Sequence, residues 1–237
     1  IWDVSDVLDS REGIESNALK LQIYLSGKIE HMVSQETLPV RLNFVTHGSG
    51  SQVLRACLAQ EDGTFEMDRV IMLAPPLCGS WVADWALATK QDTWYGSTAR
   101  ASTYDLTIAR SLAFNAMHPM LPYVSFSTRY FTIAGTGGQD LSLLARVIEQ
   151  SIRNNHPAPL QITPDELSND GLVTRQSAWG EVGKAEAHAI GNPNATWLFN
   201  VTGFNNQYSV ADDHFGMLTN CDVYVNYIWP LLSSDFP

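Results

Sequence analysis

Short apolar segments recur along the chain, separated by longer stretches with helical spacing. The short segments are rich in β-branched and aromatic residues and are apolar at nearly every position. This is typical of strands that are buried on both faces of a parallel sheet. We therefore expect five strands: "IWDVSDV" (1–7), "VRLNFVTH" (40–47), "DRVIMLAPP" (68–76), "RYFTIAGTG" (129–137) and "TWLFNVTGF" (196–204).

Between these strands, apolar positions repeat at the spacing of amphipathic helices. The clearest run covers 13–33, and further helices are expected at 51–60, at 141–155 and from about Asp222 onward. Strands and helices in alternation predict a mainly parallel sheet with helices on both faces, built by right-handed crossovers. The whole chain, 1–237, is expected to form this single α/β domain.

Residues 89–128 do not follow this regular pattern. The stretch reads "KQDTWYGSTARASTYDL" at its start and includes "MHPMLPY" near its end. We expect it to form a small cap-like insertion over the strand ends, where ligands bind in open α/β sheets.

Composition narrows the class of partner. The 237 residues carry a formal net charge of −11, which argues against nucleic acid or an anionic membrane surface. No apolar run approaches the roughly 18 residues of a membrane span, and no signal peptide is visible, so a soluble protein is expected. The chain opens at Ile1 rather than at a methionine, which favours a processed or truncated start and, with processing, an organellar location.

Cysteine, histidine and glycine patterns indicate no cofactor and no metal. The three cysteines (Cys57, Cys78 and Cys221) lack metal-ligand spacing, and we expect them to be small buried hydrophobic residues. The stretch "GTGG" (135–138) lacks the lysine of a phosphate-binding loop and favours a flexible turn. Two glycosylation sequons, at Asn194 and Asn200, are interpreted as chance matches.

The stretch "VTHGSGS" (45–51) joins a predicted strand to a predicted helix through a glycine-rich turn. Many hydrolases hold a serine nucleophile in such a turn, with small residues two positions before and after it. Gly50 supplies the small residue two positions beyond Gly48, so this register places Gly48 at the apex. Read one residue later, Ser49 becomes the apex, but His47 would then crowd the turn. By itself the motif is equally typical of a plain β–α turn.

Two later residues change this picture. Asp170 lies in "NDGLV", after the fourth predicted strand, and His214 lies in "DDHFG", after the fifth. Alone, Asp170 is typical of a turn former and His214 of a solvated surface histidine. Nucleophile turn, then acid, then histidine is the chain order of an α/β-hydrolase triad, so together they favour that fold.

With these motifs, nearly the whole chain resembles the lipase/esterase-type branch of the α/β-hydrolase superfamily. The family's elbow reads much like "VTHSMGG" and is followed by "R…VIMLAPP…GS…D", where this chain has "VTHGSGSQVLR" and "DRVIMLAPPLCGSWVAD". The resemblance implies that Asp170 is the acid and His214 the base. It places the nucleophile position on Gly48 and the glycine that follows the elbow on Ser51.

A second departure from the family concerns the oxyanion hole. An earlier strand, ending in a His-Gly loop, normally contributes a backbone N–H to it, and such donors typically contribute a factor of about 10²–10³ in rate. This chain begins near the strand that follows, so the first strands are expected to be truncated. The resemblance therefore implies a lipase/esterase-like domain that has lost serine hydrolysis and acts as a non-catalytic binding or structural subunit.

Two other interpretations are kept open. The chain is an active carboxylester hydrolase if Ser49 acts as nucleophile with His214 as base and Asp170 as the orienting acid. Alternatively, Gly48 is an introduced change that inactivates a working enzyme. The expected partners are a lipid or ester ligand and another protein chain. The second partner is expected because strand 1–7 has no charge or proline at Ile1, Trp2 and Val4 to protect an open sheet edge.

Overall fold

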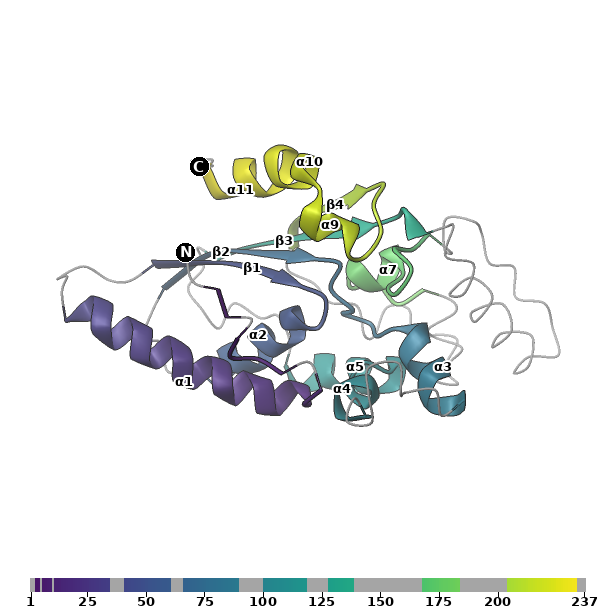
Figure 1. Ribbon diagram of the computed structural model, residues 1–237, viewed down its shortest axis with the longest axis horizontal. Helices are drawn as coiled ribbons and strands as arrows, with labels where there is room; N and C mark the ends of the chain where they lie inside the picture. The colour runs from purple at the N-terminus through teal and green to yellow at the C-terminus, as the bar shows by residue number, and fades with distance from the viewer. Residues whose placement is uncertain are drawn as a thin grey trace.

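Four parallel strands form one sheet, in the order β1-β2-β3-β4. The computed structural model (Figure 1) describes residues 3–4, 6–9, 11–34, 41–60, 66–89, 100–118, 128–138, 168–183 and 204–233. Within these ranges the strands are β1 (Arg41–His47), β2 (Glu66–Leu73), β3 (Arg129–Gly135) and β4 (Phe204–Val210). Neighbouring strands that run in the same direction require a crossover between them, and helices supply the described parts of these crossovers.

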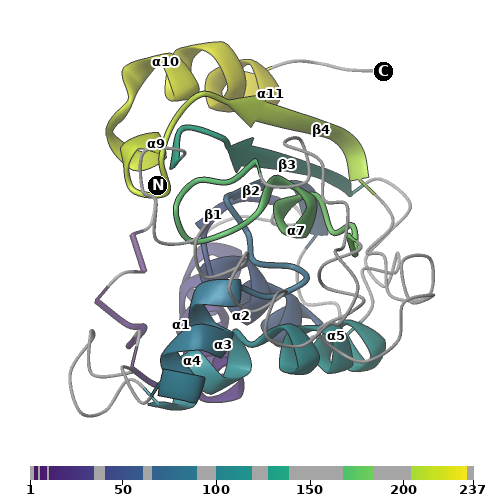
Figure 2. The same ribbon diagram turned by 90° about the vertical axis from the view of Figure 1, so that its right-hand side faces the viewer.

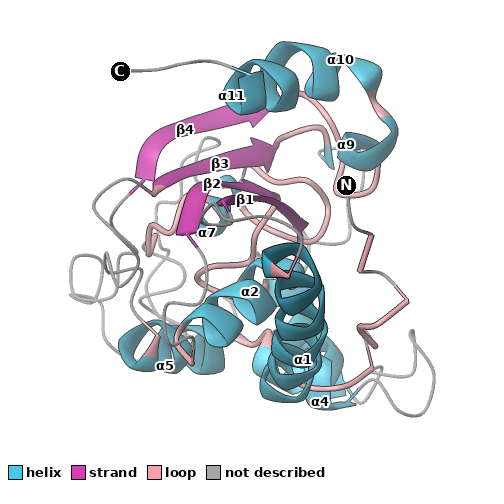
Figure 3. Cartoon of the chain, turned by 90° about the vertical axis from the view of Figure 1, so that its left-hand side faces the viewer, coloured by secondary structure: helices cyan, strands magenta, loops and turns pink. Residues whose placement is uncertain are grey.

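Helices cover both faces of the sheet, as Figures 1 and 3 show. On one face lie α1 (Ile14–Val33) and α2 (Gly50–Leu58), and on the other lie α10 (Cys221–Val223), the π-helical turn η4 (Tyr224–Ile228) and α11 (Trp229–Ser233). The central strand β2 alternates between the two layers. Val70 and Met72 pack into the core under α1 and α2, whereas Ile71 and Leu73 pack into the core under the C-terminal helices. The apolar run of β2 therefore reflects burial on both faces.

Helix α1 buries one apolar face, and its first turn is capped by a side chain from a distant part of the sequence. Its buried apolar residues are Ile14, Ala18, Leu21, Leu25 and Ile29, which recur every three or four positions. At its first turn, the amide of Ile14 donates a hydrogen bond to Oδ2 of Asp105, at 2.9 Å. A carboxylate from another segment thus satisfies an N-terminal amide of the helix.

Three helices follow β2: α3 (Trp81–Thr89), α4 (Arg100–Asp105) and α5 (Ile108–Met117). They lie on the same side of the sheet as α1 and α2, as Figures 1 and 2 show. Part of the predicted insertion at 89–128 is described, and it forms α4 and α5. None of the described helices is both long and apolar enough to cross a membrane.

The expected strands at 40–47, 68–76 and 129–137 are confirmed, as are the helices at 13–33 and 51–60 and a helical C-terminal segment. The strand predicted at 1–7 is wrong for its described residues, 3–4 and 6–7: the amides of Val7 and Leu8 donate to the carbonyl oxygen of Val4, which makes a turn. Val4 and Leu8 are apolar because they pack against the core beside α1 and α2, so their apolar character does not indicate pairing.

The last predicted strand lies mostly outside the described residues. Of the predicted strand 196–204, only Phe204 lies within the described residues, where it begins β4. The sequence of β4, "FNNQYSV", exposes Asn206, Gln207 and Ser209 and lies at the edge of the described sheet. The polar residues of β4 leave it without the apolar and β-branched character by which the other strands were found. The helix expected at 141–155 lies outside the described residues.

Candidate functional site

The turn between β1 and α2 has glycine at its apex. Gly48 has φ +53°, in the left-handed region that glycine adopts at little cost. Its amide donates a hydrogen bond to the carbonyl oxygen of Leu73 at 2.9 Å, which ties the turn to the end of β2. The backbone at residue 48 thus makes the sharp turn between β1 and α2.

Asp170 and His214 are in contact, although they come from separate loops. Oδ2 of Asp170 lies 2.8 Å from Nδ1 of His214, and Asp170 is only 1% exposed. The other carboxylate oxygen of Asp170 accepts the amides of Leu172 (2.9 Å) and Val173 (2.7 Å). The amide of His214 donates to the carbonyl oxygen of Asp170 at 2.9 Å, so side chain and backbone hold the two loops together.

The imidazole of His214 faces the apex of the turn. A Cβ atom on residue 48 would lie 3.2 Å from Nε2 of His214 and 3.6 Å from its Cε1. A side chain at position 48 would thus meet the ring atom opposite the one that contacts Asp170. The structure thus places Gly48, Asp170 and His214 close together in space.

The two serines beside the apex differ in their surroundings. The hydroxyl of Ser51 lies 2.8 Å from Oγ1 of Thr46, and Ser51 is fully buried. Ser49 lines the same pocket as His214 and precedes the first residue of α2, with helical dihedral angles (φ −61°, ψ −20°). Among the described residues, no hydrogen bond joins the hydroxyl of Ser49 to His214.

His47, at the end of β1, contacts His214 through a hydrogen bond and through its ring. Nε2 of His47 lies 2.8 Å from the carbonyl oxygen of His214, and the two ring centroids are 4.4 Å apart. Because a carbonyl can only accept, this nitrogen of His47 carries the proton. Burial lowers the pKa of His47, and the neighbouring His214 lowers it further. His47 is therefore held as a neutral imidazole near neutral pH.

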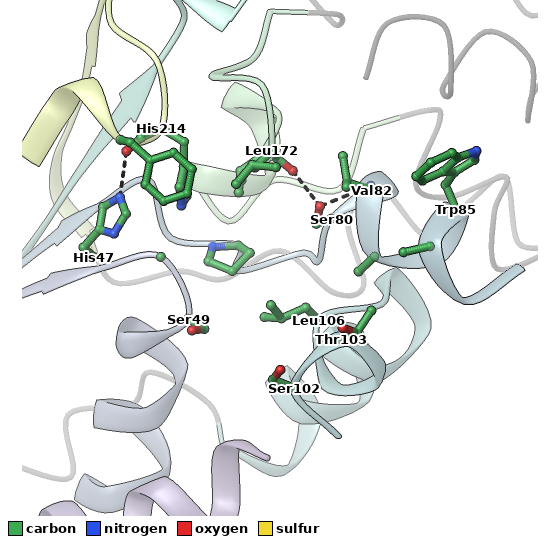
Figure 4. Close-up of a pocket in the computed structure, with 16 residues that line it drawn as sticks. His47, Ser49, Ser80, Val82, Trp85, Ser102, Thr103, Leu106, Leu172 and His214 are labelled. Atoms are coloured by element: carbon green, nitrogen blue, oxygen red, sulfur yellow. Dashed lines mark hydrogen bonds between the residues drawn. The ribbon is translucent and has the colours of Figure 1, made fainter. Parts of the chain in front are cut away.

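A pocket of about 370 Å³ opens beside the apex. Figure 4 shows His47 and His214 together at one end, Ser49 at the start of α2, and Trp85 at the opposite end. Most of the wall between these ends is apolar, from Pro76, Val82, Ala83, Ala86, Leu106, Leu172, Val173 and Phe215. Ser80, Ser102 and Thr103 also line it, and Ser80 donates its hydroxyl to the carbonyl oxygen of Leu172 at 2.6 Å. The volume lies at the lower end of the range for ligand pockets, about 300–1,000 Å³.

Sequence reasoning missed the part that the glycines after β3 play. The amide of Gly137 donates to the carbonyl oxygen of Asp212 (2.9 Å), and that of Gly138 donates to the carbonyl oxygen of Asn169 (3.0 Å). A Cβ on Gly138 would overlap the peptide between Asp170 and Gly171. The "GTGG" stretch therefore allows the acid turn and the histidine loop to approach β3 closely. The glycine pair Gly137–Gly138 at the end of the predicted strand 129–137 was the available signal.

The cysteines do not line this pocket, and the two glycosylation sequons lie outside the described residues. Cys57 and Cys78 are buried, as expected, but Cys221 is exposed at the start of α10, so that prediction is wrong for Cys221. No cluster of three or more His, Cys, Asp or Glu side chains in the described ranges could hold a metal ion. Asn194 and Asn200 lie outside the described residues.

Comparison with known proteins shows the fold of the chain. The sequence matches no protein-family model and no curated protein. Among solved structures, the mature form of lipase BlEst2 from Bacillus licheniformis matches with a TM-score of 0.62 and 18% identity, covering 94% of this chain and 76% of that chain. The propeptide form of the same lipase matches with a TM-score of 0.60 and 17% identity, covering 95% of this chain and 42% of that chain. The chain thus has the α/β-hydrolase fold, with a parallel sheet between helices.

Proposed function

We propose that this chain is a lipase/esterase-like domain that has lost serine hydrolysis and acts as a non-catalytic binding or structural component. One observation carries the proposal: the acid–histidine pair is assembled, but the residue that faces Nε2 of His214 is Gly48. The fold shared with a lipase supports the ancestry.

The missing group is the one that the chemistry needs first. In a serine hydrolase the histidine removes the proton of the serine hydroxyl, and the acid orients the histidine. The hydroxyl oxygen then attacks the carbonyl carbon, and an acyl-enzyme forms. Asp170 and His214 could carry out their two steps, but glycine at position 48 offers no oxygen to attack.

Ser49 is the alternative nucleophile, but its position gives little support to an active carboxylester hydrolase. To react, its hydroxyl would have to reach the space where a Cβ on residue 48 would lie. Ser49 lies one residue further along, in the helical conformation that begins α2. Displacements of about 1 Å can already cost about 10²-fold in rate.

Hydrolysis of short p-nitrophenyl esters tests the proposal directly. We expect turnover by the unaltered chain to equal the background without protein. Turnover above background that disappears in Ser49→Ala and persists in Ser51→Ala would overturn the proposal and establish the Ser49 mechanism.

A gain-of-function variant provides the converse test. Gly48→Ser places a hydroxyl beside Nε2 of His214, and we expect it to be labelled covalently by an organophosphate, whereas the unaltered chain is not. Gly48→Ala is the matched control because it carries the same backbone strain at positive φ without the hydroxyl. Equal labelling of the serine and alanine variants would show that position 48 does not face the histidine.

A partner chain was expected at the edge of a strand at 1–7, but the described residues of that stretch, 3–4 and 6–7, form no strand, so the prediction is wrong for that place. The proposal of a structural component instead assigns the partner to the open side of the sheet at β1. Within the described ranges no strand pairs with the outer edge of β1, and Val45 on this strand is 46% exposed. Unpaired strand edges with apolar side chains invite another chain. We expect light scattering at several concentrations to reveal association, and a stable monomer throughout would contradict this part of the proposal.

A further inference from the structure

We propose that the pocket beside Gly48 binds an apolar carboxylic acid, such as a medium-chain fatty acid, with its carboxylate against His214. This inference rests on the proposed loss of hydrolysis, because it assigns a ligand to the same site. The carboxylate occupies the space that a nucleophile side chain would otherwise fill.

The first argument is an unpartnered nitrogen in a buried side chain. His214 is 8% exposed, and its Nδ1 is taken by Asp170. Its Nε2 faces the pocket and has no hydrogen-bond partner among the described residues. Nε2 is not among the fully buried side-chain atoms without a partner, so it is open to the pocket, and a ligand there can form a hydrogen bond with it.

The second argument is the space left by glycine. A Cβ at position 48 would come within 3.2 Å of Nε2, tighter than an ordinary van der Waals contact between such atoms. Without this carbon, an oxygen atom can approach Nε2 at hydrogen-bond distance. The absence of a side chain at position 48 thus opens the place where a carboxylate oxygen would bind.

The third argument is a second donor at the same place. The amide of Ser49 has no acceptor among the described residues, and it directly follows the apex of the turn. In turns of this geometry, the amide after the apex points to where negative charge forms. Ser49 also precedes α2, a helix of nine residues whose N-terminal end favours an anion.

The rest of the pocket suits a hydrocarbon chain. Its wall between the histidines and Trp85 is mainly apolar, with Leu106, Leu172 and Phe215 among the lining residues. A ligand with one charged end and an apolar body therefore matches the pocket along its length. The volume of about 370 Å³ favours a short or medium chain over a long one.

Binding should take up one proton. Nδ1 of His214 donates to the carboxylate of Asp170, so a neutral His214 presents a lone pair at Nε2. A carboxylate also presents only lone pairs, and the pair needs one proton from solvent between the two atoms. The product is a charge-assisted hydrogen bond, which is stronger than a neutral one.

The titratable groups beside His214 are already bound to other groups. Asp170 contacts the ring from the acid turn, and His47 at the end of β1 is neutral because burial lowers its pKa. On the histidine's own loop, Asp213 accepts the amides of Phe215 and Gly216, and Asp212 accepts the side-chain amide of Asn220.

Calorimetric titration of the whole chain with decanoate, methyl decanoate and decanol tests the inference. We expect decanoate to bind about tenfold or more tightly than the ester or the alcohol, because only the acid forms the charge-assisted bond. Titrations in two buffers of different ionisation enthalpy should show uptake of about one proton per bound decanoate. Equal affinity for the three probes, or no binding of decanoate, would overturn the inference.

Two variants test whether decanoate binds at His214 and Gly48. His214→Leu should abolish both the preference for decanoate and the proton uptake, whereas Gly48→Ser should weaken decanoate binding by filling the carboxylate position. Gly27→Ala, on the exposed side of α1, is the control, and circular dichroism verifies folding in each case. Proton uptake that persists in His214→Leu would contradict the assignment. Hydrolysis of methyl decanoate by the unaltered chain would instead refute the proposed loss of activity, so the two failures are distinguishable.

Discussion

Asp170 and His214 are joined twice, by a 2.8 Å contact between Oδ2 and Nδ1 and by a 2.9 Å hydrogen bond from the amide of His214 to the carbonyl oxygen of Asp170. The second bond joins the backbones of the two loops and does not involve either side chain. Asp170 therefore has a structural role, independent of any nucleophile, in a chain with glycine at position 48.

Two substitutions of Asp170 distinguish the effect of its charge from the effect of the hydrogen bonds that its side chain accepts. We expect Asp170→Ala to lower the free energy of unfolding by about 2–4 kcal/mol, because the amides of Leu172 and Val173 lose their acceptor in a buried place. Asp170→Asn keeps an oxygen for these amides and should cost less. Urea unfolding measures both, with the exposed Asp222→Asn as control. Equal losses in the Asn and Ala variants would show that the charge, and not the acceptor, matters.

The glycine after β3 should be far more sensitive than a glycine in a helix. A Cβ on Gly138 would overlap the Asp170–Gly171 peptide, so Gly138→Ala should displace the acid turn and cost more than about 2 kcal/mol of unfolding free energy. Gly27 in α1 has no atom near such a Cβ, and Gly27→Ala should stabilise by about 0.5–1 kcal/mol. Similar effects of the two substitutions would contradict the close approach at Gly138.

Asp84 should make stability depend on pH. Burial raises the pKa of this carboxyl group to about 6, although it accepts the amide of Ile108 at 3.0 Å. Because the folded-state pKa lies above the ordinary value near 4, its stabilising contribution is complete below about pH 4 and is lost as the pH rises through about 6. Asp84→Asn, which keeps an acceptor for Ile108, removes this loss.

The measurement for Asp84 is a comparison of unfolding free energies at two pH values. Between about pH 4 and pH 7, the difference between Asp84→Asn and the unaltered chain should move in favour of the variant by up to about 3 kcal/mol. Other carboxylates cancel in this difference because both proteins share them. A difference that does not change with pH would show that the carboxyl group titrates normally.

Thiol reactivity should distinguish the three cysteines. Cys221 is exposed, whereas Cys57 and Cys78 are buried in the core. We expect a thiol-specific chromogenic reagent to modify one cysteine rapidly in the native protein and all three after denaturation. In Cys221→Ser the rapid phase should vanish. A rapid phase that persists in this variant would mean that a buried cysteine becomes accessible.

The sequence by itself determined the elements whose burial has a simple period. The strands at 68–76 and 129–137 were visible because both of their faces are covered. The strand at 40–47, which is exposed at alternate positions, was visible by its β-branched and aromatic residues. Helix 13–33 was visible because one of its faces is buried. The sequence also determined the order of Gly48, Asp170 and His214, because each lies in a motif of its own. These features depend on neighbours along the chain, so a local pattern is sufficient to reveal them.

Only the tertiary structure decided the features that depend on contacts between distant segments. Val4 and Leu8 are apolar because they pack on the core as part of a turn, and an apolar run does not distinguish that from a strand. The polar β4 became a strand by pairing with β3 at the edge of the described sheet. Gly138 permits an approach to Asp170, whose position is set by the fold and not by the intervening sequence. Register, edge position and close approach arise when separate segments meet, and hydrophobic periodicity contains no information about which segments will do so.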